Sequence, residues 1–143
     1  MEVTIDDSLT YGFLYERLKN AYLEHDRLII AYDIDDTVRP YKSKSCENIK
    51  ALIRRAKKVL NPNFIVFTAN LHNNKNTDFL INENLPFDTI NENISGVGDN
   101  DKKLKIYYNL FLDDKAGLAE AYLALDELCD TVEHGYIRKE KNQ

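Results

Sequence analysis

The chain has 143 residues, of which 43% are hydrophobic, so it is long enough for one sizeable core and too short for two. Its 19 basic and 24 acidic residues give a net charge of -5, which argues against an obligate nucleic-acid-binding protein. Cys46 and Cys129 share no short spacing, which favours two reduced thiols over a zinc site or a disulfide framework. The N-terminus is acidic where a signal peptide would be basic, and no apolar run approaches the roughly 18 residues of a membrane span. We expect one domain, 1–143, in a soluble cytoplasmic protein without a membrane partner.

The first part of the chain predicts a helix followed by a buried strand. Over 8–25, apolar and tyrosine residues recur at three- and four-residue steps between charged residues, as in an amphipathic helix. The run LIIAYDI at 28–34 is short, rich in β-favouring residues and not alternating, which is typical of a strand buried on both faces of a parallel sheet. Three carboxylates, those of Asp33, Asp35 and Asp36, lie at its end.

Helix and strand patterns alternate through the middle of the chain. The second helix has Ser45 as a candidate N-cap and is stopped by Asn61-Pro62. The second strand repeats the pattern of the first, because its apolar run also ends in a polar residue, Thr68. The expected elements are a helix over 45–60, a strand over 64–67, a short helix over 76–83 and a short strand over 87–90.

The last third of the chain predicts a loop, a strand, a helix and a tail. A glycine-containing loop covers 91–103. The run KIYYNLFLDD predicts a strand that ends in a second acidic pair, Asp113 and Asp114. A helix is expected over 116–132, and the charged tail 134–143 is expected to fray.

This alternation predicts an α/β fold: a Rossmann-like parallel sheet of four to five strands with helices on both faces. Right-handed crossovers return the chain to the same end of the sheet, so the carboxyl ends of all strands share one edge, where ligands bind in such folds. The polar residues expected at that edge are Asp33, Asp35, Asp36, Thr68, Asp113 and Asp114. Carboxylates crowded together must take up protons or a cation, and hard oxygen ligands favour Mg²⁺.

The order of these residues resembles the haloacid dehalogenase superfamily of phosphohydrolases, whose first motif is an apolar strand followed by Asp-x-Asp-x-Thr or Val. DIDDT matches that motif, and the resemblance covers the chain from about Leu28 to Gly117. It implies that Asp33 is the nucleophile that forms an aspartyl-phosphate and also a metal ligand. Asp35 would be the general acid and base, with its backbone carbonyl on the metal.

The resemblance also implies roles for the later strand ends. Thr68 would bind a phosphoryl oxygen, and Asp113 and Asp114 would complete the shell of a Mg²⁺ ion. The family's third motif is a lysine that neutralises the nucleophile and the phosphate, and here the sequence departs from the pattern. Lys103 is the favoured residue, and the alternatives are Lys102, Lys105, Lys75 and Lys115. Lys105 is expected roughly 20 Å from the aspartates, at the far end of its strand.

Each of these residues also has a purely structural explanation. Aspartates at strand ends serve in turns and as helix caps, and Thr68 alone is more often a simple strand-end hydroxyl. Arg39 could bind substrate phosphate or be a solvated loop residue, and His72 could contact substrate or lie at the surface. The motif order favours the functional explanation, because independent caps would not reproduce it.

We therefore expect a Mg²⁺-dependent phosphomonoesterase that acts through an aspartyl-phosphate. The connections after the first motif and after Thr68 are too short for a cap domain. An open site suits a macromolecular or end-group phosphate, with nucleic acid only as a substrate, or a small molecule enclosed by a second subunit of an oligomer. The alternatives are a non-catalytic or regulatory module that binds metal and phosphate, and a phosphotransferase or a response-regulator-like receiver, whose different motif order argues against it.

Overall fold

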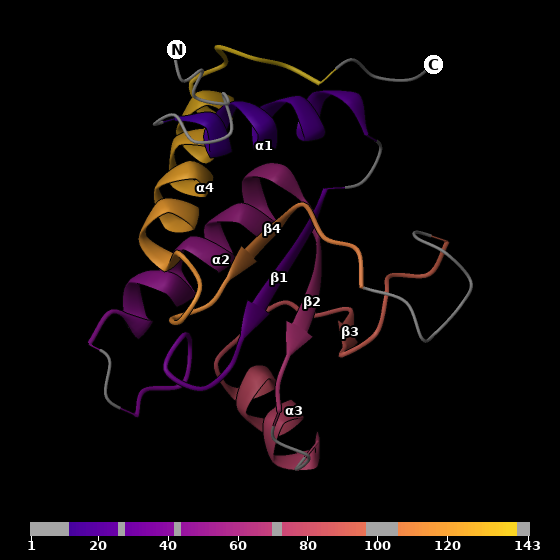
Figure 1. The fold of residues 1–143 in the computed structure, drawn as a ribbon, viewed down its shortest axis with the longest axis vertical. Coiled ribbons are helices and arrows are strands. Elements are labelled where there is room, and N and C mark those ends of the chain that lie inside the picture. Colours follow the sequence, from indigo (N-terminus) through magenta and orange to yellow (C-terminus); the bar gives the residue numbers. More distant parts are fainter. Residues whose placement is uncertain (1–11, 26–27, 42–43, 70–72, 97–105, 140–143) are drawn as a thin grey trace, which may run out of the picture.

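The computed structural model describes residues 12–25, 28–41, 44–69, 73–96 and 106–139. Helices and strands alternate through these ranges, except that the last two strands follow each other with no described helix between them (Figure 1). The elements are, in chain order, α1 (Phe13–Glu24), β1 (Ile29–Asp33), α2 (Cys46–Leu60), β2 (Asn63–Phe67), α3 (Asn73–Asn82), β3 (Thr89–Ile90), β4 (Leu110–Leu112) and α4 (Leu118–Glu133).

The described strands form one parallel sheet in the order β3-β2-β1-β4. β1 lies at the centre, with Asp33 paired to Phe67 of β2 and Tyr32 paired to Leu112 of β4. This register brings the carboxyl ends of β1, β2 and β4 to the same edge, as the alternation of helices and strands predicts. The predicted α/β fold with a Rossmann-like parallel sheet is therefore confirmed.

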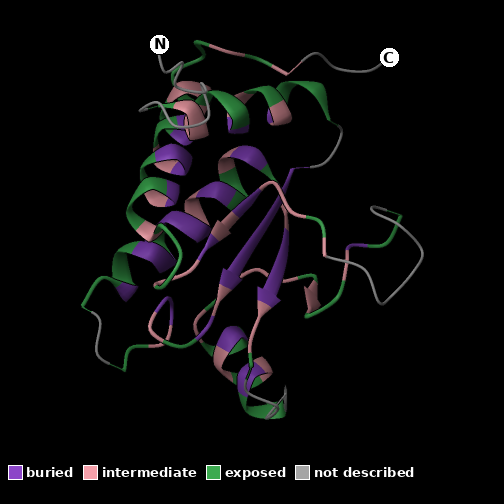
Figure 2. Cartoon of the chain, in the orientation of Figure 1, coloured by how far each residue is buried: buried purple, intermediate pink, exposed green. Residues whose placement is uncertain are grey.

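The main core lies between the sheet and the helices. Tyr32 and Phe64 point into it from β1 and β2 and make an edge-to-face contact with ring centroids 5.9 Å apart. Leu18 of α1, Ile53 of α2 and Leu125 of α4 belong to the same buried cluster. Figure 2 shows β1 and β2 as almost wholly buried, which explains why their sequences are continuously apolar.

The other face of the sheet is covered differently from the expectation of helices on both faces. Its buried cluster contains Ile29, Ala31 and Ile65 from the strands and Ile94 from the connection after β3. Among the described residues, no helix contributes to this cluster, whereas α3 contributes Leu80 to the main core. The apolar character of a strand shows that both faces are buried, but it does not show whether a helix or a connecting segment buries them.

The last strand, β4, covers only Leu110–Leu112 and is therefore shorter than the strand expected over 105–114. The backbone N–H of Asn109 donates to the carbonyl of Ile29, and the Asn109 side-chain oxygen accepts a hydrogen bond from the Ile29 N–H. Pairing with β1 begins there, since β1 itself begins at Ile29. Ser45 occupies the N-cap position of α2 as expected, but its side chain makes no capping hydrogen bond.

The described part of the predicted tail lies against the helices. Ile137 packs against the main core, and the ammonium group of Lys139 lies 5.4 Å from the centroid of the Tyr22 ring. Within the described ranges, none of the helices has both the length and the apolar character required to cross a bilayer.

Candidate active site

Three aspartates from two neighbouring strands meet at the carboxyl edge of the sheet. Asp33 ends β1, and Asp113 and Asp114 follow β4 directly. One carboxylate oxygen from each of the three lies within 4.8 Å of the others. The alignment follows from the register, since Tyr32 pairs with Leu112 and the next residue on each strand is an aspartate. The sequence prediction that these carboxylates converge is therefore confirmed for Asp33, Asp113 and Asp114.

The Thr37 hydroxyl lies between the two acidic segments. Its oxygen is 3.5 Å from Oδ2 of Asp33 and 3.4 Å from Oδ1 of Asp114, and it accepts a hydrogen bond of 3.1 Å from the Asp114 N–H. Thr37 is fully buried. Its single hydroxyl proton can be donated to one of the two carboxylates at a time, so Thr37 ties the end of β1 to the segment after β4.

A tight turn connects β1 to the rest of the first motif. The carbonyl of Ile34 accepts backbone hydrogen bonds from Thr37, Val38 and Arg39, and the Asp36 N–H donates to the carbonyl of Arg39. Asp36 has a φ of 62°, in the left-handed region that aspartate tolerates better than most residues. The turn folds the motif back over the strand end, which is why Thr37 reaches the carboxylates.

Burial and charge repulsion change the ionisation of this cluster. Partial burial, followed in importance by the negative charges of Asp113 and Asp114, raises the pKa of Asp33 to about 6. Burial and the neighbouring Asp114 also raise the pKa of Asp113, although a hydrogen bond from the Lys115 N–H opposes this rise. In the absence of a cation the cluster therefore favours bound protons. Perturbed carboxylates at one edge are a common feature of functional sites.

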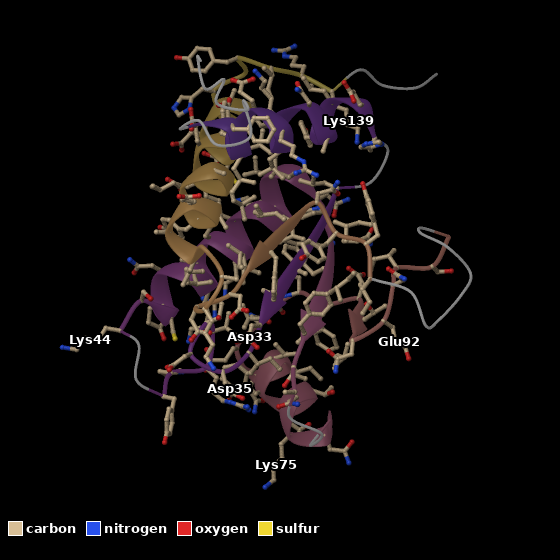
Figure 3. The ribbon with its side chains drawn as sticks, in the orientation of Figure 1. Asp33, Asp35, Lys44, Lys75, Glu92 and Lys139 are labelled. Carbon is tan, nitrogen blue, oxygen red and sulfur yellow. The ribbon has the colours of Figure 1, made fainter. Side chains whose placement is uncertain are left out.

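Asp35 does not join the other three aspartates and pairs with Arg39 instead. Its Oδ1 accepts hydrogen bonds from Nε and Nη2 of Arg39 at 2.9 and 2.6 Å. Asp35 is not among the three aspartates that share the 4.8 Å cluster. Figure 3 shows Asp33 and Asp35 at the same end of the sheet. The carboxylate of Asp35, predicted to act as general acid and base, therefore lies near the site but is paired with the Arg39 guanidinium.

Thr68 lies one residue beyond β2, at the same edge of the sheet as Asp33. Its backbone N–H donates to Oδ1 of Asn91 at 3.0 Å, and its carbonyl accepts from Nδ2 of Asn91 at 2.9 Å. Asn91 follows β3 directly and has a φ of 55°. The side-chain amide of Asn91 thus takes the place of the backbone of β3 and pairs with both the N–H and the carbonyl of Thr68. These two hydrogen bonds fix the backbone of Thr68 at the end of β2.

The predicted lysines divide into three groups. Lys102, Lys103 and Lys105 lie outside the described residues, as does His72. Lys75 extends outward from α3, away from Asp33 and Asp35 (Figure 3). Lys115 directly follows Asp114, its N–H donates to Oδ1 of Asp113, and its charge lowers the pKa of Asp113.

Two surface hollows lie outside the acidic cluster. One is formed by α1 and the residues 107–109 that precede β4, at the end of the sheet opposite to Asp113. The other runs beside β4 and includes Arg17, Phe111 and Glu120. The second hollow reaches Ala116 and Gly117, which closely follow the acidic pair in the chain, but neither hollow is lined by an aspartate of the cluster.

Sequence reasoning missed three residues at this edge. Thr37 could have been found, because it is the last residue of DIDDT, whereas its contact with Asp114 joins residues far apart in the chain. Asn76, fully buried in α3, and Asn91 gave no signal, since isolated asparagines are common in loops and helix ends.

Comparisons of the chain with protein-family models, with curated proteins and with solved structures found no match.

Proposed function

We propose that this protein is a Mg²⁺-dependent phosphomonoesterase in which Asp33 is the nucleophile. The observation that carries this proposal is the convergence of Asp33, Asp113 and Asp114 at the carboxyl edge of a parallel sheet. Phosphoryl transfer requires a nucleophile beside concentrated positive charge, and a carboxylate cluster that holds a divalent cation supplies both.

The three carboxylates fit a Mg²⁺ ion by their chemistry and spacing. With Mg–O distances of about 2.1 Å, octahedral geometry places ligand oxygens about 3 Å apart when adjacent and about 4.2 Å apart when opposite. The oxygens of Asp33, Asp113 and Asp114 lie within 4.8 Å of one another, so small side-chain movements suffice. When bound, the cation would neutralise the carboxylates and draw charge from a phosphoryl oxygen.

Two transfers complete the proposed reaction. A carboxylate oxygen of Asp33 attacks phosphorus, the bond from phosphorus to the ester oxygen breaks, and Asp35 in its protonated form gives a proton to the departing oxygen. Water then attacks the phosphorus of the aspartyl-phosphate, the bond from phosphorus to the Asp33 oxygen breaks, and Asp35 takes a proton from that water. The products are an alcohol and inorganic phosphate, and both aspartates return to their initial state.

An open site favours substrates whose phosphate projects from a larger molecule. The connection from β1 to α2 covers 34–45, and the connection from β2 to β3 covers 68–88 and contains α3. Neither is long enough for a cap domain. We propose a phosphorylated protein or a nucleic-acid terminus as the substrate class, since either can bring its own surface to an uncovered site.

The proposal is tested by hydrolysis of phosphate monoesters with Mg²⁺ or with a chelator. Suitable substrates are p-nitrophenyl phosphate, a phosphopeptide and an oligonucleotide with a terminal phosphate. We expect Mg²⁺-dependent release of phosphate, its loss in Asp33→Asn, and its retention in Asp78→Asn, which changes an exposed aspartate of α3. Hydrolysis that persists in Asp33→Asn would rule out the assignment.

A non-catalytic module that binds metal and phosphate is the second candidate. It is favoured by the ion pair that holds Asp35 on Arg39, because a carboxylate in such a pair is not in position to transfer a proton. This candidate predicts binding of Mg²⁺ and phosphate without hydrolysis of any monoester. The same experiment distinguishes the two functions.

A further inference from the structure

The side chain of Arg39 joins the first motif to α3. Besides its two hydrogen bonds to Asp35, its Nη1 lies 3.4 Å from Oδ1 of Asn76. The guanidinium carbon lies 5.5 Å from the centroid of the Phe79 ring, in a cation–π contact. Its backbone is fixed as well, because the Arg39 N–H donates to the carbonyl of Ile34.

These contacts differ in how easily they can be exchanged. Asn76 is fully buried and Phe79 packs against the core, so both keep their positions. The Asp35 side chain is 55% exposed, and an ion pair with an exposed carboxylate contributes only about 0 to 1 kcal/mol. The contacts with α3 therefore hold the guanidinium in place, whereas Asp35 can be replaced by another anion at low cost.

A phosphate group is a suitable replacement for the carboxylate of Asp35. The guanidinium presents parallel N–H groups that match two oxygens of a phosphate as well as two oxygens of a carboxylate. The site needs such a cation, because Asp33, Asp113 and Asp114 repel an approaching phosphate dianion. Among the residues that the structure describes, Arg39 forms an ion pair with Asp35, and the positive charge of Lys115 lowers the pKa of Asp113.

We propose that Arg39 is the anion-binding residue of the site and that it exchanges Asp35 for a phosphoryl oxygen of the substrate. The arrival of phosphate then releases the Asp35 carboxylate from the guanidinium, so that it can take up a proton from solvent and give that proton to the departing oxygen. Binding and chemistry are thereby coupled through one guanidinium. This inference rests on the proposed phosphatase function, since it assigns Arg39 a role at the same site.

The first test measures the affinity of inorganic phosphate in the presence of Mg²⁺ by calorimetry. Arg39→Ala should weaken phosphate binding by about 10- to 100-fold, the usual effect of losing hydrogen bonds to a charged group. Arg39→Lys keeps the charge and loses the planar fork, so its affinity for phosphate should lie between those of Arg39→Ala and the unmodified protein. Arg54→Ala is the matched control, because Arg54 contacts Glu83 just beyond the end of α3 rather than Asp35, Asn76 or Phe79, and it should bind phosphate as the unmodified protein does.

The second test uses the competition between Asp35 and phosphate. Asp35→Asn should tighten phosphate binding several-fold when Arg39 is present, because it removes the competing carboxylate. In the Arg39→Ala background the same substitution should have a much smaller effect, since the guanidinium for which the two anions compete is gone. If the role of the pair were purely structural, Asp35→Asn would weaken phosphate binding when Arg39 is present and would change it little in the Arg39→Ala background, where the pair is already lost. Phe79→Leu gives an independent check, because losing the ring under the guanidinium should weaken phosphate binding in the same direction as Arg39→Lys.

The outcomes separate this inference from the proposed function. If the protein hydrolyses monoesters and Arg39→Ala raises KM as it raises the Kd for phosphate, both are supported. If hydrolysis occurs and Arg39→Ala changes neither KM nor the Kd, the inference is overturned and the function stands. If no monoester is hydrolysed but phosphate binding still depends on Arg39 and competes with Asp35, the function is overturned and anion exchange at Arg39 is supported.

Discussion

Asp33 has the environment that a carboxylate nucleophile needs, because it lies at a strand end beside two other carboxylates and a buried hydroxyl. A carboxylate attacks only when it is ionised, whereas burial and its acidic neighbours raise its pKa to about 6. A bound cation reverses this tendency by stabilising the negative charge. Metal binding would therefore both assemble the site and prepare its nucleophile.

The raised pKa of Asp33 predicts how pH affects the stability of the metal-free protein. The pKa is about 6 in the native state against 3.8 for an ordinary aspartate. Between these values the native state binds more protons than the unfolded state, so the free energy of unfolding falls as pH rises. The loss should be on the order of 2 kcal/mol, after allowance for screening by solvent.

Urea unfolding in chelator between pH 4 and pH 7 measures this loss. In Asp33→Asn the fall should be clearly smaller, whereas Asp78→Asn should retain it. A fall of equal size in Asp33→Asn would show that other groups cause the pH dependence.

The Thr37 hydroxyl should matter for metal affinity although it need not touch the metal. Thr37→Val removes the acceptor of the Asp114 N–H and the contact with Asp33, so the carboxylates lose their relative position. Loss of such an orienting partner typically lowers metal affinity by about 10- to 100-fold. Calorimetric titration with Mg²⁺ should show this loss in Thr37→Val and near-normal affinity in Thr37→Ser. Equal affinities in all three proteins would contradict the orienting role.

At the residue level, the sequence was informative where a residue's position depends on the strand that carries it. Asp33, Asp113 and Asp114 could be predicted at one edge because each follows an apolar run, and parallel strands end together. The partner of Asp35 could not be predicted, because Arg39 reaches it through a turn in which Asp36 adopts a left-handed conformation. Local sequence does not determine such a turn, since several loop residues tolerate that region.

Among the elements, the helices matched their predicted positions better than the shortest strands did. An apolar stripe continued over four turns identifies a helix such as α2, whereas β3 and β4 are too short to produce a periodic pattern. Side-chain amides extend these two strands: Asn109 at the start of β4 and Asn91 after β3. Such hydrogen bonds depend on residues that are distant in the chain and leave no periodic signal.

The contact between α2 and α4 includes a polar network centred on Arg55. Its guanidinium contacts Asp126 at 2.9 Å, and it also pairs with Asp130 and Glu133, all three on α4. Hydrogen bonds to Glu133 and Asp130 raise the pKa of the guanidinium, so the network favours the charged form. It joins the two helices at their partly exposed edge, beside the buried leucines.

Arg55→Met should therefore destabilise the protein while leaving the acidic edge intact. The substitution removes three ion pairs and leaves three carboxylates close together, so we expect a fall in Tm on the order of 5 °C at low salt. Lys58→Met, at an exposed position of the same helix, should have little effect. The difference between the two variants should shrink at high salt. A difference that is independent of salt would indicate that packing, rather than charge, is responsible.

On the scale of the whole molecule, the chain carries a net negative charge, and negative charge is also concentrated locally at the acidic edge. The net charge is -5, and three aspartates are brought together only when β1 and β4 pair. The folded state is the state that binds a cation, because the unfolded chain separates Asp33 from Asp113. Cation binding and folding should therefore be linked.

We predict that Mg²⁺ raises Tm, by about 5 to 10 °C when its concentration is 100 times the Kd. Asp113→Asn and Asp114→Asn should each reduce this shift, and each should melt at or above the Tm of the unmodified protein in chelator, because repulsion is relieved. Asp126→Asn, which is remote from the edge, should keep the full Mg²⁺ shift. A Tm that does not respond to Mg²⁺ would contradict a metal site at this edge.

The covalent state of Asp33 during turnover tests the proposed chemistry most directly. Asp35→Asn lacks the group that activates water, so a phosphoryl group transferred to Asp33 should persist in this variant. After brief reaction with p-nitrophenyl phosphate and Mg²⁺, followed by acid quench, mass spectrometry should find one added phosphoryl group on the peptide that contains Asp33. The group should be absent in Asp33→Asn/Asp35→Asn and in chelator. Hydrolysis of the ester by the unmodified protein, with no phosphoryl group on Asp33 in Asp35→Asn, would contradict the proposed nucleophile.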